Sequence, residues 1–490
     1  MVSNRGLFCL RMKTINKNRA DLLLLFSKGK YRAIQDMVMP AIEYYVSDDE
    51  ILLGVIIYDR EDDCFAYVLN DRNSLMQYEC VQLDFDIPTL EDARTRLNHC
   101  MQNYVRDVGV LTREGTVLDF FKQITSDKEI NPYFKLLESS DAYTSAKEVI
   151  REVSYHFKDR DGNFIEQFQT KNGFDSRIWE LYLLCYLREE GFNVDQNYDV
   201  PDFFVEKLGE KVAIEAVICK RREEKYGEPM PEYTLDEMFT KLDKEIPLIF
   251  GSSLFSKVRH ECNKKKYWEI EHVKDVPLLF AIEDFHEDAS MMWTYNGIIS
   301  ILYGIEQNIM NDDSGKVVLN TTNGRVFVKD GKNGPVEILP LFFNPEFENV
   351  SAVLFSATGT LSKFNRMGRQ AGFGIHNSIM FQTKCTYNHD KNALLPNFIG
   401  KVIDENCHET WGDGVSIFHN PLAKIPLDPT LFPHAAHHFY NDGQLYSDIP
   451  RGHTICSFTW NLIGNQSDVQ DFCLKSRAKY DETSKQWNMK

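Results

Sequence analysis

The sequence predicts a multidomain α+β protein, and three observations support this fold class. The chain has 490 residues, enough for two to four domains at roughly 100–200 residues each. Short apolar segments separated by polar turns predict strands near the N-terminus, and the middle of the chain follows one long helical pattern with three strand patterns. The hydrophobic content of 43% and the charged content of 26% are those of a globular protein, which excludes a disordered or fibrous chain.

Residues 1–110 are predicted to form an acidic α+β accessory domain. Two apolar segments, 51–58 and 64–69, flank a polar turn and predict a β-hairpin, and the segment after Pro88-Thr89 has the pattern of a capped helix. Residues 41–100 carry a net charge of −10, out of −18 for the whole chain. This part of the sequence contains no recognisable catalytic cluster.

The remaining chain is predicted to divide into three parts. Apolar residues at helical spacing within 117–157 predict a helical connector at 111–150. Residues 151–290 form the predicted core. Residues 291–490 combine a helix with strands and with turns rich in Gly, Asn, Pro and His, which predicts a β-rich α+β region in a position to complete the core sheet.

Neither a membrane span nor a secretory signal is predicted. The longest early apolar run, residues 22–26, is far shorter than the roughly 20 residues that a bilayer requires. The N-terminus lacks the apolar segment of a signal peptide. The eleven cysteines occur singly without a C-x-x-C pair, which is typical of reduced thiols rather than of a disulfide framework or a zinc ribbon. We therefore expect a cytoplasmic protein with no membrane contact.

The most informative segment begins with a predicted helix at residues 174–191. Asp175 or Ser176 is expected to cap its start, and Gly191 is expected to end it in the left-handed conformation. Glu180 lies beside the apolar stripe of this helix. A carboxylate in that position is costly unless another group pairs with it.

Three strand patterns follow the helix, at residues 192–195, 201–206 and 211–218, and the turn between the last two predicts an antiparallel hairpin. Asp202 begins the second strand, and Glu215 stands inside the apolar third strand. These two carboxylates are therefore expected to converge with the one on the preceding helix.

A hard divalent cation offsets such carboxylates best, because Mg²⁺ prefers oxygen ligands and commonly takes one or two protein carboxylates together with waters and phosphate oxygens. We expect Asp202 and Glu215 to bind Mg²⁺, for which Mn²⁺ can substitute. Glu180 is expected to bind a second ion or a metal-bound water.

This order of elements resembles the PD-(D/E)xK, or restriction-endonuclease-like, nuclease superfamily over roughly residues 150–290. The resemblance rests on Glu180 in the first helix, on Pro201-Asp202, and on Glu215-Ala216-Val217 thirteen residues after the aspartate. A predicted helix and a predicted strand follow in the family's order. The resemblance implies an α/β core with a mixed sheet flanked by helices, and a Mg²⁺-dependent endonuclease that hydrolyses phosphodiester bonds.

The sequence departs from the family at the lysine of the motif, where it has Val217. That lysine is understood to orient the attacking water and to offset charge on the phosphorane. Some family members supply it from the following helix, and here Lys257 is the predicted replacement. Lys220 is the alternative, but strand alternation points it away from the face of Glu215.

The resemblance implies that nucleic acid, and DNA rather than RNA, is the substrate, with restriction or defence against foreign DNA as the setting. Basic side chains close to the site in sequence are predicted to contact phosphates. They are Lys220, Arg221, Arg222 and Arg259. The alternative is a catalytically inactive protein of the same fold that binds nucleic acid or protein. The acidic N-terminal domain is expected to repel DNA, to mimic it at the core, or to bind a protein partner, and self-association stays open.

Two further patterns lie in the C-terminal region. His434, His437 and His438 have a spacing that would place two imidazoles on one helix face, as in a metal-dependent hydrolase, but without the accompanying glutamate structural histidines are favoured. Residues 363–369 are predicted to be a basic loop that either contacts phosphate or connects two strands.

Overall fold

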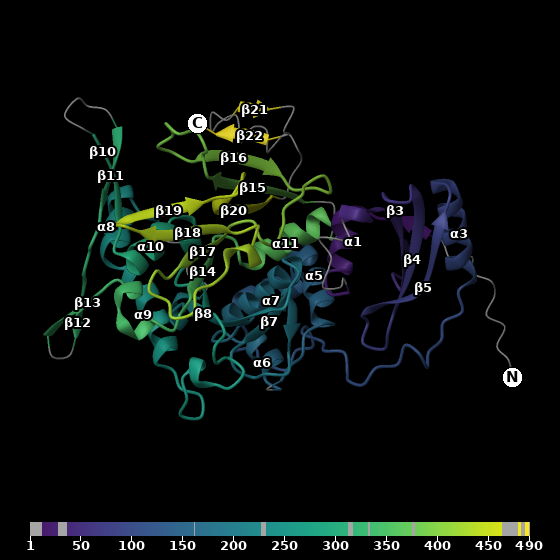
Figure 1. Cartoon of the computed structure of the whole chain (residues 1–490), viewed down its shortest axis with the longest axis horizontal. Coiled ribbons are helices and arrows are strands. Elements are labelled where there is room, and N and C mark those ends of the chain that lie inside the picture. The colour runs from purple at the N-terminus through teal and green to yellow at the C-terminus, as the bar shows by residue number, and fades with distance from the viewer. Residues whose placement is uncertain are drawn as a thin grey trace.

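The computed structural model describes residues 12–27, 37–160, 162–226, 232–311, 317–331, 334–374, 378–462, 479–481 and 486–489. It is an α+β protein with mixed and antiparallel sheets (Figure 1). Within the described residues, no helix is both long and apolar enough to span a bilayer.

The N-terminal region is a five-stranded antiparallel sheet in the order β1-β2-β3-β4-β5. Its elements are β1 (Met12–Thr14), α1 (Lys17–Leu23), β2 (Ala41–Ser47), β3 (Leu52–Asp59), β4 (Cys64–Arg72), β5 (Tyr78–Ile87) and α3 (Leu90–Asn103). The predicted hairpin is β3–β4, and Thr89 caps α3 by accepting the N–H of Asp92 at 3.1 Å. One face of this sheet packs on α3, whereas the other joins the core of the central region.

The helices after this sheet are shorter than the sequence predicts. They are α4 (Pro132–Ser139), α5 (Thr144–Ser154), α6 (Phe164–Gln169) and α7 (Phe174–Glu189). The long helical pattern is broken because Asn131 and Pro132 begin a new helix and a 3₁₀ turn separates α4 from α5. Arg72 of the N-terminal sheet donates to both carboxylate oxygens of Glu152 in α5, at 2.9 and 3.0 Å, and so ties this sheet to the helices.

The central sheet has eight strands in the order β19-β18-β17-β14-β9-β8-β7-β6. They are β6 (Asn193–Asp195), β7 (Phe203–Lys207), β8 (Glu210–Cys219), β9 (Leu278–Asp284), β14 (Ala352–Ser356), β17 (Val415–His419), β18 (Ala436–Asn441) and β19 (Gln444–Asp448). Strands β8, β9 and β14 run parallel to one another, whereas β7 pairs antiparallel with both β6 and β8. The C-terminal region, residues 291–490, therefore contributes four strands, β14, β17, β18 and β19, to the sheet that contains the β7–β8 hairpin.

Helices cover both faces of this sheet, as its fully buried strand β9 requires. Leu279 and Ala281 of β9 face α7, and Phe280 and Ile282 face the opposite side. That opposite side is covered by α9 (Ile246–Arg259) and α10 (Tyr295–Tyr303), with α8 (Leu235–Lys244) packed against α9. Helix α10 ends at Tyr303, because Gly304 takes a left-handed conformation.

The C-terminal region adds a second five-stranded sheet and two hairpins. The sheet has the order β20-β15-β16-β22-β21, and both hairpins project from the body in Figure 1. The hairpins are β10 (Glu306–Asn311) with β11 (Val317–Thr322), and β12 (Phe327–Gly331) with β13 (Gly334–Ile338). The sheet consists of β15 (Ile379–Thr386), β16 (Asn397–Val402), β20 (Thr454–Leu462), β21 (Lys479–Asp481) and β22 (Gln486–Met489). Helix α11 (Leu361–Gln370) precedes β15 in the chain.

The prediction of a basic loop at residues 363–369 is wrong, because these residues lie in helix α11. Lys363 and Arg366 are buried and both form ion pairs with Glu409. Gly368 lets α11 approach α5 closely, since a Cβ at this position would lie 2.3 Å from the Ser145 carbonyl oxygen. The basic pattern therefore marks a buried helix rather than a phosphate-binding loop.

Candidate functional site

The candidate site lies where strand β7 begins beside strand β8. Phe203 of β7 pairs with Ile214 of β8, so Asp202 stands opposite Glu215 just before the pairing starts. The Asp202 N–H donates to Glu215 Oε2 at 3.3 Å, and the Ala216 N–H donates to Asp202 Oδ2 at 2.8 Å. The aspartate side chain thus satisfies a backbone donor of β8 that β7 no longer reaches.

Helix α9 brings Lys257 to this carboxylate pair. The Lys257 Nζ donates to Glu215 Oε1 at 2.5 Å, and the Tyr267 hydroxyl donates to the same oxygen at 2.8 Å. Burial lowers the pKa of Lys257, but the charges of Glu215, Asp202 and Glu180 outweigh burial and raise it above its ordinary value. Lys257 therefore carries a full positive charge at neutral pH.

Helix α7 brings Glu180 to the other side of Asp202. Arg177 donates to both oxygens of Glu180, at 2.9 and 2.7 Å, and its guanidinium also contacts Gln167. Burial, followed by the charge of Asp202, raises the pKa of Glu180 to about 7. The predicted cap of α7 is not formed, because Gly173 is the N-cap residue and makes no side-chain cap hydrogen bond.

The four predicted residues of the site are thus brought together, and carboxylates outnumber the nearby lysine. The pKa of Asp202 is raised to about 7, first by burial and then by the charge of Glu215. The three carboxylates of Glu180, Asp202 and Glu215 face two cations, Arg177 and Lys257, so one negative charge is left without a protein partner, and this is the condition that an added divalent cation relieves.

These donors fit a Mg²⁺ ion of the kind that takes few protein ligands. In the described part of the chain, no group of three or more His, Cys, Asp or Glu side chains is placed to hold a metal ion. Two carboxylates, here those of Asp202 and Glu215, are the usual number of protein ligands at a Mg²⁺ site, and waters and substrate oxygens supply the remaining ligands. Glu180 is already held by Arg177 in a bidentate pair, which suits a role at the edge of such a site.

The basic side chains predicted to contact phosphate have three different placements. Lys220 and Arg222 are exposed beyond the end of β8. Arg259 is also exposed and pairs with Glu346 at 2.7 Å. Arg221 is only 6% exposed and its Nη1 donates to Asp288 at 2.6 Å, so this guanidinium points into the protein.

The prediction that the C-terminal histidines could share a helix face is wrong, because residues 436–441 form strand β18. His437 and His438 are consecutive strand residues and point to opposite faces. His437 is hydrogen-bonded to His419 at 2.9 Å, and His438 to the Tyr295 hydroxyl at 2.9 Å. Burial lowers the pKa of His438 to about 3. These are neutral structural histidines with protein partners.

Tyr267 is the site residue that sequence reasoning missed. It follows the end of α9 and lies in a short 3₁₀ turn, where no motif marks it. Its hydroxyl reaches Glu215 only because the segment after α9 folds back over strand β8.

No protein-family model matches this chain, and neither a curated protein nor a solved structure has significant similarity to it.

Proposed function

We propose that this chain is a divalent-metal-dependent nuclease that hydrolyses phosphodiester bonds of DNA, with a restriction-endonuclease-like core and a role in restriction or defence against foreign DNA. The observation that carries the proposal is the approach of Lys257 to Glu215 beside Asp202. A lysine from the following helix there can replace the one that Val217 cannot supply.

The proposed roles follow from where the charges lie. Asp202 and Glu215 would hold Mg²⁺, which when bound polarises the phosphate and lowers the pKa of attacking water. Lys257 places a fixed positive charge where negative charge develops on the phosphorane. Arg177 fixes the rotamer of Glu180, and Tyr267 fixes one oxygen of Glu215, so that the carboxylates are positioned before substrate binds.

The arrangement is open to solvent on the side of the lysine. The side chain of Lys257 is 32% exposed, whereas that of Glu215 is 8% exposed. We infer that a phosphate group approaches the carboxylates from the side of Lys257, where the site is more exposed. The exposed Lys220 and Arg222 add positive charge along the same end of β8.

A second candidate function is a binding module of the same fold without catalysis. The observation that favours it is the engagement of Glu215 Oε1 by both Lys257 and Tyr267, which completes an ion pair without any metal. In this case Lys257 holds helix α9 against β8, and the site has a structural role.

The deciding experiment is a Mg²⁺ and Mn²⁺ titration with supercoiled plasmid, linear duplex and single-stranded DNA. Wild type is compared with Asp202→Asn, Glu215→Gln and Lys257→Met, and Lys424→Met is the matched control, because Lys424 forms a surface pair with Glu348. We expect metal-dependent cleavage by wild type and by the control, and a loss of at least about 100-fold in each site variant.

Calorimetric titration with Mn²⁺ separates the two candidates without relying on turnover. Wild type that binds Mn²⁺ more tightly than Asp202→Asn, but cleaves no DNA, would indicate a metal-binding protein without nuclease activity. Equal Mn²⁺ affinity in both proteins, again without cleavage, leaves the binding module.

A further inference from the structure

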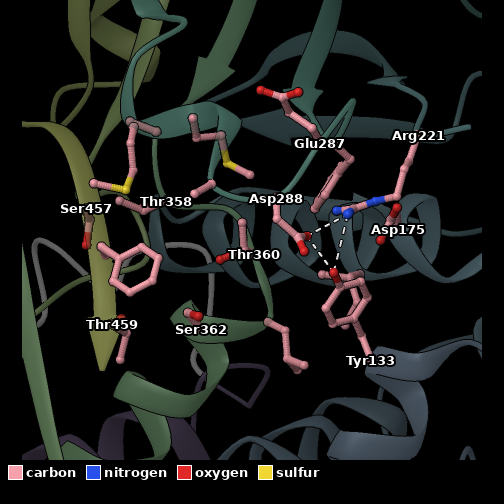
Figure 2. A pocket seen from close by; sticks show the side chains of 18 of the residues that line it. Tyr133, Asp175, Arg221, Glu287, Asp288, Thr358, Thr360, Ser362, Ser457 and Thr459 are labelled. Atoms are coloured by element: carbon pink, nitrogen blue, oxygen red, sulfur yellow. Dashed lines mark hydrogen bonds and ion pairs between the residues drawn. The ribbon is translucent and has the colours of Figure 1, made fainter. Parts of the chain in front are cut away.

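A cavity of about 330 Å³ lies at the carboxyl ends of the parallel strands β8, β9 and β14. Its walls come from the first turn of α7, the loops after β8 and β9, the start of α11, and strand β20 (Figure 2). Ligands of open α/β sheets commonly bind at this edge of the sheet. The cavity is separate from the carboxylate pair of Asp202 and Glu215, neither of which lines it.

One wall of the cavity is a buried charged cluster around Arg221. The Arg221 Nη1 donates to Asp288 Oδ1 at 2.6 Å and to the Tyr133 hydroxyl at 3.3 Å, and Figure 2 shows the guanidinium between Asp288 and Asp175. The Nε of Arg221 is buried without a hydrogen-bond partner in the described structure. The buried Nε is out of reach of a ligand, but these contacts engage only Nη1, so the Nη2 donors of this cavity-lining side chain receive no acceptor from any described residue.

The same wall carries acceptors. Asp175 is buried, accepts one hydrogen bond from Tyr226 at 2.8 Å, and has its pKa raised to about 6 by burial. Asp288 uses one oxygen for both Tyr133 and Arg221. Its second oxygen receives no hydrogen bond from any described residue. Donors from Arg221 and acceptors from two carboxylates therefore stand side by side.

The remaining walls are mostly apolar or carry hydroxyl groups, and the charged side chains on them, Glu287 and Arg366, are engaged by Tyr233 and Glu409. Phe174, Phe285 and Met291 contribute apolar surface. At the other end, Thr360 is the N-cap residue of the ten-residue helix α11 and makes no side-chain cap hydrogen bond, and Ser362 lies in its first turn. The first backbone N–H groups of a helix bind anionic oxygen, most readily phosphate.

We propose that this cavity binds a guanine nucleotide unit. Guanine presents N1–H and N2–H₂ donors next to its O6 and N7 acceptors, so carboxylates such as Asp288 and Asp175 can accept from the former while Arg221 donates to the latter. The apolar walls accommodate the planar base, and the start of α11 receives the phosphate. A simple cationic ligand would satisfy the carboxylates but would be repelled by Arg221 and would leave its donors unused.

The unit comes either from a free nucleotide or from a base of a nucleic acid turned out of its strand. The proposal does not depend on nuclease activity, because binding is measured without divalent metal.

The test is calorimetric titration of the full chain with guanosine, inosine, adenosine and cytidine monophosphates in metal-free buffer. Guanosine monophosphate is expected to bind most tightly. Inosine monophosphate, which lacks the exocyclic amine, is expected to bind about 10-fold more weakly, and adenosine and cytidine monophosphates about 100-fold more weakly. This series uses the wild-type protein alone, so it is decisive even if the variants fail to fold.

Variants then assign the contacts. Arg221→Met and Asp288→Asn are each expected to weaken guanosine monophosphate binding by about 10- to 100-fold, while the control Arg96→Met, which removes an exposed surface pair with Asp84, leaves it unchanged. Thermal unfolding of each variant shows whether the fold is intact.

Three results would overturn the proposal: equal affinity for guanosine and cytidine monophosphates, unchanged affinity in both folded variants, or displacement of guanosine monophosphate by spermidine at a lower concentration than by guanosine. The source is assigned by competition with a single-stranded guanine-containing oligonucleotide. Displacement at a concentration at least 10-fold below that of the mononucleotide supports a nucleic-acid base, and a higher concentration supports a free nucleotide.

Discussion

Two buried charge clusters in this protein have opposite balances. In the C-terminal region, Lys363 and Arg366 of α11 both pair with Glu409, at 2.7 and 2.8 Å, so two cations surround one carboxylate. Burial raises the pKa of Glu409, but the two cations outweigh burial and hold this pKa well below its usual range. At the candidate site the carboxylates are in excess, and the pKa of Asp202 is instead raised to about 7.

The difference is between a cluster whose charges are matched by protein cations and one with an excess of carboxylates. Glu409 accepts hydrogen bonds on both oxygens from the two cations, and its pairing needs no further group. Asp202 and Glu215 repel each other across the start of β7, and under the proposed function a bound divalent cation would relieve this repulsion. Carboxylates whose ionised form is disfavoured in this way are common at binding sites and catalytic sites.

The largest expected effect is on the cluster of Lys363, Arg366 and Glu409, which we call the saturated cluster because both oxygens of its carboxylate are paired with cations. Glu409→Gln leaves Lys363 and Arg366 buried without their counter-charge, and should reduce the free energy of unfolding by about 3–5 kcal/mol at pH 7. Because the folded pKa of Glu409 is depressed, its contribution is present above the unfolded pKa and is lost as pH falls, so the deficit should shrink below about pH 4. Urea denaturation measures both. The surface control Glu348→Gln should cost less than about 1 kcal/mol.

The candidate site should respond in the opposite direction. Asp202→Asn removes one of two repelling carboxylates while an amide oxygen can still accept the Ala216 N–H, so stability at pH 8 should rise by about 2 kcal/mol. A raised folded pKa means that stability falls as pH rises from about 4 to 7, so the gain should vanish near pH 4. A loss of stability at pH 8 in urea denaturation would contradict an excess of negative charge at this site.

The sequence predicted the architecture around the candidate site better than it predicted the saturated cluster. The helix with Glu180, the β7–β8 hairpin and the strand β9 were recognisable because local periodicity and turn residues define them. The α11 cluster was missed because Glu409 lies far from Lys363 in sequence, so the basic segment resembled an exposed loop. Tyr267 was missed for the same reason, since its contact with Glu215 depends on tertiary folding after α9.

Glu283, a carboxylate outside the candidate site, tests whether a raised pKa alone is enough to indicate a functional residue. Glu283 at the end of β9 is fully buried, and both of its oxygens lack a hydrogen-bond partner within the described residues. Burial, and then the charge of Asp284, raises its pKa well above the ordinary value. Glu283→Gln should stabilise the protein by about 1–2 kcal/mol at pH 8 and by little near pH 4.

The activity of Glu283→Gln distinguishes this residue from Asp202. Metal-dependent cleavage should be retained in Glu283→Gln and lost in Asp202→Asn, although both variants gain stability. Equal loss of cleavage in the two variants would show that Glu283 belongs to the working site.

The smallest expected effect concerns how Lys257 adjusts the carboxylates. Its positive charge lowers the pKa of Asp202, against the larger raising effects of burial and of Glu215. In Lys257→Met the pKa of Asp202 should therefore rise further above its value of about 7. Because metal binding requires the ionised carboxylate, the pH midpoint of Mn²⁺ affinity should move upward by up to about one unit, measured by calorimetry between pH 6 and 9. Lys424→Met should leave the midpoint unchanged. A midpoint that does not move in Lys257→Met would mean that the lysine serves only to hold α9 against β8, and the candidate site would then resemble the saturated cluster around Glu409.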